Sequence, residues 1–104
     1  MAAPAILVAD DHPLFRQALA MAVAKVRPGA TVIEAGTLAA AEEAVRTAPA
    51  LALILLDLKM PGATGYSGVA LLHAEAPGVP ILVVSSADAA QAARESQAFG
   101  AVGF

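Results

Sequence analysis

Three aspartates stand directly after two apolar runs of the chain. Asp10 and Asp11 follow the run Ala5–Ala9, and Asp57 follows the run Leu53–Leu56. If these runs are neighbouring parallel strands, their carboxyl ends meet at one edge of the sheet, which is where open α/β sheets bind ligands. Three crowded carboxylates repel one another, and a hard divalent cation relieves that repulsion. Magnesium, which binds carboxylate oxygens and keeps several waters, suits such a site.

The first two acids also have a plainer interpretation. A helix that begins at Pro13 needs a cap at its N-terminus, and Asp11 is well placed to supply one. Because one carboxylate is enough for a cap and two are present, we expect capping and metal binding together. His12 follows the two acids and is expected to make only local packing contacts or hydrogen bonds.

Short apolar runs alternate with helical stretches, and these elements would position the acids. Strands are expected at Ala5–Ala9, Thr31–Ala35, Leu53–Leu56 and Ile81–Val84, with a fifth strand starting at Ala101–Phe104. Helices are expected from Pro13 to a stop at Pro28-Gly29, over Leu38–Thr47, from about Ser67 to Glu75 and from about Asp88 to Phe99. Near-continuous apolar strands indicate burial on both faces. The alternation therefore predicts an α/β fold with right-handed crossovers.

The first and fourth expected helices differ in apolar content. Phe99 is the only large apolar side chain in the helix from Asp88 to Phe99. Because alanine buries little area, we expect that helix to be held less firmly than the first. The first helix has an apolar face made of Phe15, Leu19, Ala22, Val23 and Val26.

Composition excludes several classes of protein. The chain has 104 residues, enough for one domain with a modest core. Its net charge of −3 gives no electrostatic case for this chain itself binding nucleic acid. No apolar run approaches the roughly 18 residues that span a membrane, and the N-terminus lacks a basic signal-peptide region. The absence of cysteine excludes disulfides, thiolate nucleophiles and Cys-based zinc sites, and a cytoplasmic location is expected.

Four motifs stand in order at the expected strand ends: VADDHP, DLKMPGATG (Asp57–Gly65), VVSS and FGAVGF. In this combination the chain resembles the response-regulator receiver domains of two-component signalling. DDHPLFRQAL and GYSGVALL look most like the NarL/FixJ type, whose receivers are usually joined to a LuxR-type helix-turn-helix. The resemblance covers the whole chain. It implies one receiver domain over residues 1–104, with a doubly wound, flavodoxin-like, five-stranded parallel sheet in the order 2-1-3-4-5 and helices on both faces.

The resemblance also implies roles for the acids. Asp57 would accept a phosphoryl group from a sensor histidine kinase, since an ionised carboxylate is a nucleophile that needs no deprotonation. Asp11 would bind Mg²⁺ directly, Asp10 mostly through water, and the backbone carbonyl of Lys59 would complete the protein ligands. Such a domain is not an enzyme in the ordinary sense, because it catalyses only its own phosphorylation and dephosphorylation.

Two further residues match the switch positions of the family. Ser85 would be the hydroxyl that moves toward the phosphoryl oxygens, and Phe104 the aromatic residue whose rotamer follows that movement. Taken alone, Ser85 is better explained as a strand-end serine bonded to nearby backbone, and Phe104 is equally well explained as an ordinary core residue. The implied partners are the kinase, a second copy on activation, and DNA only through an output domain outside this chain; no membrane is involved.

The chain departs from the family pattern at its end. The family has a lysine three residues beyond the switch aromatic, and Phe104 is the last residue here. We therefore expect a chain truncated in or after the fifth strand, without the final helix. A degenerate receiver that acts only as a protein-interaction module remains an alternative. An aspartyl-phosphate hydrolase is less well supported, because its second aspartate would fall at Lys59.

Overall fold

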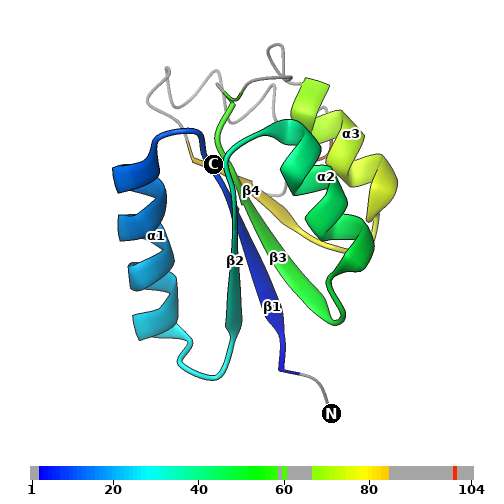
Figure 1. Cartoon of the computed structure of the whole chain (residues 1–104). Coiled ribbons are helices and arrows are strands. Elements are labelled where there is room, and N and C mark those ends of the chain that lie inside the picture. The colour runs from blue at the N-terminus through cyan, green and yellow to red at the C-terminus, as the bar shows by residue number, and fades with distance from the viewer. Residues whose placement is uncertain (1–2, 59, 61–66, 85–99, 101–104) are drawn as a thin grey trace.

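The computed structural model describes residues 3–58, 60, 67–84 and 100. Its elements, in chain order, are β1 (Ala5–Ala9), α1 (Pro13–Val26), β2 (Thr31–Ala35), α2 (Leu38–Thr47), β3 (Leu51–Leu56), α3 (Ser67–Glu75) and β4 (Ile81–Val83). The strands form a parallel sheet in the order β2-β1-β3-β4, with α1 on one face and α2 and α3 on the other (Figure 1). This confirms the predicted α/β fold and the order of its first four strands. The expected fifth strand and fourth helix lie outside the described residues.

Most element boundaries follow local signals. Pro13 opens α1, where its missing N–H is not needed. The Thr37 hydroxyl caps α2 by accepting a hydrogen bond from the Ala40 N–H at 3.1 Å. β3 begins two residues earlier than predicted, because Leu51 already pairs with Ala5. β4 ends one residue earlier than predicted, at Val83.

The pairing of β1 with β3 contains one irregularity, far from the acids. Ala5 pairs with Leu51 and Ile6 pairs with Leu53, so Ala52 is an extra residue on β3 at this point. From Ile6 onward the two strands stay in register up to the pair Ala9–Leu56. The extra residue is a β-bulge at the amino ends of both strands.

The main core lies between the sheet and the α2–α3 layer. Leu7 and Ile54 of the sheet and Leu72 of α3 are each 0% exposed. Burying one such side chain fully contributes about 1.5–3 kcal/mol. The same cluster takes in Leu38 and Ala41 of α2. This side of the sheet therefore supplies most of the apolar burial in the described residues.

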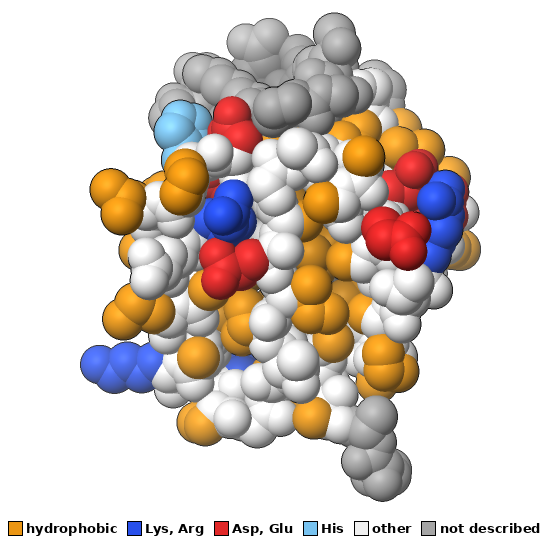
Figure 2. Space-filling view, viewed as in Figure 1, with side chains coloured by type: hydrophobic (Ala, Val, Ile, Leu, Met, Phe, Trp, Pro, Cys, Tyr) orange, Lys and Arg blue, Asp and Glu red, His pale blue; other side chains and the backbone are white. Residues whose placement is uncertain are grey.

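The opposite side is covered more thinly, and one expectation fails there. The expected apolar face of α1 leaves Phe15 at 49% and Val26 at 74% exposure, and no residue of α1 is fully buried. Only Leu19 and Val23 of that face are partly buried. The cause is the place of α1 at the edge of the sheet. α1 contacts β1 and the edge strand β2, so the residues of α1 that point past β2 have no sheet beneath them. Apolar side chains project along α1 in Figure 2.

Edge position also explains β2. All five residues of β1 are buried, as predicted for a strand covered on both faces, whereas Thr31 and Glu34 of β2 are exposed.

α1, at 14 residues, is the longest helix described. None of the described helices combines the length and apolar character needed to cross a membrane.

An ion-pair cluster joins α2 to α3. The Arg46 guanidinium lies 3.3 Å from a Glu75 carboxylate oxygen and 3.2 Å from a Glu42 oxygen. The hydrogen bond to Glu75, and then the negative charge of Glu42, raise the pKa of Arg46 above its usual value. Since the guanidinium is exposed, the cluster orients the two helices more than it stabilises them.

Candidate metal-binding site

The register of β1 and β3 places two of the acids side by side. Ala9 pairs with Leu56, and the Asp57 N–H donates to the Ala9 carbonyl at 2.9 Å. On the other side of β1, the Asp10 N–H donates to the Ala35 carbonyl at 3.0 Å. Both acids are therefore held by the continuing sheet. Asp10 is 3% exposed and Asp57 is 8% exposed, so their charges are largely removed from water.

The turn between β1 and α1 is built on the Asp10 side chain. Its Oδ1 accepts a hydrogen bond from the His12 N–H at 2.8 Å, the pattern of an Asx-turn. His12 is the N-cap residue of α1, and its side chain makes no capping hydrogen bond. The expectation that Asp11 is the cap is therefore wrong. The Asp10 carboxylate, and not the Asp11 carboxylate, bonds the backbone at the start of α1.

One oxygen of Asp11 is buried and accepts no hydrogen bond within the described residues. The His12 Nδ1 atom lies 3.0 Å from this Oδ1 and 3.4 Å from the Asp10 Oδ1, and these contacts are ion pairs only when the imidazole is protonated. A buried acceptor without a partner is destabilising by about 1–3 kcal/mol. A buried, unpaired carboxylate oxygen that lies next to two other carboxylates is well suited to bind a cation.

The distances within the cluster fit a single ion. Asp10, Asp11, His12 and Asp57 each offer one ligand atom, and these atoms all lie within 4.8 Å of one another. Oxygens on opposite sides of a magnesium ion are about 4.2 Å apart, so small side-chain movements would close the site. Three carboxylates suit magnesium or calcium better than a softer metal. The sequence did not lead us to expect the His12 imidazole beside the three carboxylates. The signal that could have shown it is the position of His12 directly after Asp11.

The structure thus brings together Asp10, Asp11 and Asp57, the three acids predicted to lie at one edge of the sheet. The other predicted site residues, Lys59, Ser85 and Phe104, lie outside the described residues. Their roles, like the metal and phosphoryl roles of the acids, stay predictions.

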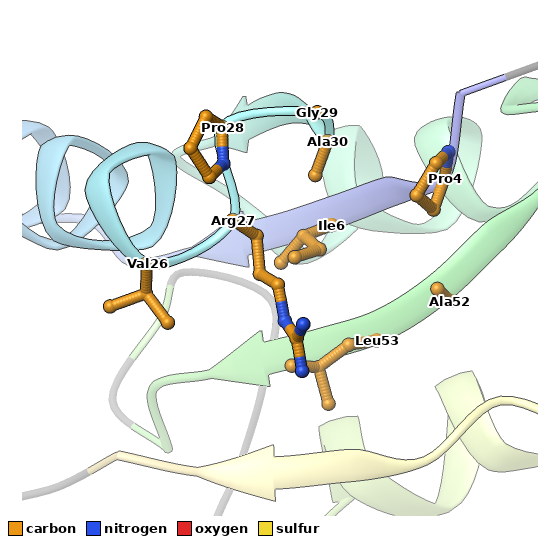
Figure 3. Close-up of a pocket in the computed structure, with 9 residues that line it drawn as sticks. All are labelled: Pro4, Ile6, Val26, Arg27, Pro28, Gly29, Ala30, Ala52 and Leu53. Atoms are coloured by element: carbon orange, nitrogen blue, oxygen red, sulfur yellow. The ribbon is translucent and has the colours of Figure 1, made fainter.

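A second hollow lies at the opposite ends of the strands (Figure 3). Its volume is about 490 Å³, and Arg27 is the one charged residue in its lining. The Arg27 side chain reaches across the hollow toward Leu53. The remaining lining is apolar or backbone, from Pro4, Ile6, Val26, Pro28, Gly29, Ala30, Ala52 and Leu53. No acid or nucleophile is among the described residues that line it, so the acidic cluster is the stronger candidate for chemistry.

Comparison with known proteins decides the family. The family model described as the response regulator receiver domain matches residues 6–104. The chain belongs to this family. Receiver domains are signalling modules of two-component systems. The parallel sheet and the acidic cluster at its edge, described above, belong to this receiver domain.

Two curated relatives contain a similar segment. The receiver domain is 42% identical over 99 residues to the glycerol metabolism activator of Pseudomonas putida, covering 95% of this chain and 45% of that protein. It is 43% identical over 81 residues to protein-glutamate methylesterase/protein-glutamine glutaminase 2 of Anaeromyxobacter dehalogenans, covering 78% of this chain and 23% of that protein. The chain thus spans less than half the length of either relative.

Solved structures agree on the fold. The signal receiver domain of the response regulator NarL from Mycobacterium tuberculosis is 28% identical, with a TM-score of 0.82 over 100% of this chain and 83% of that one. A response regulator from Burkholderia pseudomallei is 27% identical, with a TM-score of 0.81 over 96% of this chain and 57% of that one. The structure of the latter contains a phosphorylated aspartic acid, a calcium ion and citrate.

Proposed function

We propose that this receiver domain accepts a phosphoryl group from a sensor histidine kinase on Asp57, in a step that requires Mg²⁺. One observation carries the proposal: Asp57 directly follows the buried carboxyl half of β3 and lies beside Asp10 and Asp11, and Asp11 has a buried oxygen without a hydrogen bond within the described residues. The phosphorylated aspartic acid and calcium ion in the similar Burkholderia pseudomallei protein support it.

The chemistry follows from the positions of the acids. A carboxylate oxygen of Asp57 forms a bond to phosphorus while the bond from phosphorus to the donor nitrogen breaks, and that nitrogen keeps the electron pair. A carboxylate is itself a nucleophile, so the step needs no general base to activate a hydroxyl or thiol. Asp10 and Asp11 would hold the cation, which when bound neutralises charge on the phosphoryl oxygens. Burial of Asp57 limits the access of water to the same position.

Intact-mass measurement tests the proposal. The protein is incubated with acetyl phosphate as a small phosphodonor, with Mg²⁺ or with a chelator. We expect the mass to rise by one phosphoryl group only when Mg²⁺ is present, because three unneutralised carboxylates repel an anionic donor. Peptide mapping should place the group on the segment that contains Asp57. No gain with Mg²⁺ would favour the protein-interaction alternative.

We propose that the output controlled by this domain is a helix-turn-helix transcription regulator. Support comes from the motifs DDHPLFRQAL and GYSGVALL, from the similarity to the NarL receiver, and from the relative named as an activator. The methylesterase relative favours a different output, a catalytic domain joined to the receiver. The nucleotide sequence of the gene around this segment tests which of these outputs, if either, is encoded with the receiver.

The switch prediction concerns residues 85–104. If Ser85 moves toward the phosphoryl oxygens and Phe104 follows, a phosphoryl mimic would shift an equilibrium between two packings of that segment. We expect amide exchange, measured with and without the mimic plus Mg²⁺, to change most between Ser85 and Phe104. The change should shrink in Ser85→Ala. Changes concentrated in α2, whose Leu38 and Ala41 are buried in the core, would contradict this switch.

A further inference from the structure

Arg16 of α1 makes two contacts behind the acidic site. Its NH1 group donates to the backbone carbonyl of Asp10 at 3.0 Å, and its Nε donates to a Glu34 carboxylate oxygen at 3.1 Å. The side chain is 23% exposed, so these contacts are only partly screened by solvent. A guanidinium presents donors in a fixed fork, and this one joins the end of β1 to the edge strand β2.

With Arg16 in place, the backbone N–H, the backbone carbonyl and the Oδ1 atom of Asp10 each have a hydrogen-bond partner. Its N–H donates to the Ala35 carbonyl, its Oδ1 accepts from the His12 N–H, and its carbonyl accepts from Arg16. The next residue is Asp11, whose buried Oδ1 belongs to the candidate metal site. The Arg16 contact is made to the carbonyl of the Asp10–Asp11 peptide, which is the peptide that carries the Asp11 side chain into the site.

Gly36 makes room for this contact. A Cβ atom at position 36 would lie 2.8 Å from the Arg16 NH1 group. That is closer than real Cβ contacts come, and the atom that must move is the end of a flexible side chain. An alanine at this position would therefore displace the guanidinium at little cost in folding free energy.

We propose that Arg16 is a positioning residue that fixes the Asp10–Asp11 turn for cation binding. Glu34 holds the Arg16 guanidinium in place, and the absence of a side chain at Gly36 leaves room for it. Arg16 touches neither the cation nor the phosphoryl group. The metal part of this inference rests on the proposed function, whereas the ordering of the turn does not. Pairing with Glu34 also offsets the positive charge of Arg16, which would otherwise disfavour a cation nearby.

The test uses two variants and two matched controls in the whole chain. Gly36→Ala displaces the guanidinium, and Arg16→Met removes it. Gly78→Ala adds a methyl group at a glycine with nothing within 4 Å, and Arg46→Met removes the guanidinium of the α2–α3 ion-pair cluster. The measurements are amide exchange at His12 by NMR without metal, Mg²⁺ affinity by calorimetry, and the melting temperature.

We expect both variants, and neither control, to lower His12 amide protection by about tenfold and to weaken Mg²⁺ binding by about tenfold. Arg16→Lys should recover part of the affinity, since an ammonium can make one of the two contacts. Unchanged His12 protection in both variants would overturn the proposal, whether or not the protein binds Mg²⁺. Lost protection with unchanged Mg²⁺ affinity would overturn its metal part. A wild type that binds no Mg²⁺ would refute the proposed function, and His12 protection would still decide whether Arg16 orders the turn.

Discussion

Replacing Asp57 with asparagine should abolish the gain of one phosphoryl group from acetyl phosphate and Mg²⁺. The amide has nearly the same shape as the carboxylate, so the end of β3 keeps its place beside β1. It has no anionic oxygen, however, and cannot form the acyl-phosphate bond. Intact mass after a fixed incubation measures the effect, with peptide mapping of any product that remains.

A matched control separates loss of the acceptor from loss of negative charge. Glu43→Gln removes one exposed carboxylate from α2 and should leave the mass gain unchanged. A gain in Asp57→Asn equal to that of wild type would show that another group accepts the phosphoryl. A gain on His12, the nearest alternative nucleophile in the cluster, would move the acceptor to the α1 side of the site.

The Asp11→Asn substitution should weaken metal binding and stabilise the metal-free protein at the same time. Loss of an anionic ligand should lower Mg²⁺ affinity at least about tenfold, or about 1.4 kcal/mol. Without metal, the amide removes charge repulsion with Asp10 and Asp57, and its NH2 group can place a donor where the unpaired Asp11 Oδ1 now lies. We expect a gain of about 1 kcal/mol, or roughly 4 °C or more in melting temperature.

Calorimetric titration and thermal unfolding with a chelator measure the two effects. High salt should reduce the stability gain, because part of it is repulsion between charges and salt screens such repulsion. Glu43→Gln again serves as the control, with neither property changed. A large loss of stability in Asp11→Asn would mean that this side chain is structural, against the observation that it does not cap α1.

Sequence reasoning predicted most of the fold because local signals and burial agree in these elements. The apolar run Ala5–Ala9 is β1 without change, and Pro13 and Thr37 mark the starts of two helices. The apolar face of α1 could not be predicted correctly, because periodicity shows that Phe15 and Val26 share a face but not whether the sheet extends beneath it. That depends on where α1 lies across the strands.

The candidate site was predicted in outline for a similar reason. Parallel strands end at the same edge, so acids that follow two neighbouring strands must meet. The capping role of Asp11 was wrong, since the Asp10 side chain bonds the turn backbone first. The Arg16–Glu34 contact could not be predicted, because it joins residues 18 positions apart through the placement of a helix on a strand pair.

The bulge at Ala52 has a consequence for variation in chain length. In a parallel pair, each residue inserted or deleted shifts a strand by about 3.3 Å and turns its side chains to the other face. Such a shift at the carboxyl end would carry Asp57 away from Asp10. Here the extra residue is absorbed at the amino end, and the register from Ile6 to Ala9 is unaffected. Among the described loops, the one that leads into β3 is therefore a place where we expect insertions to leave the spacing of the three aspartates unchanged.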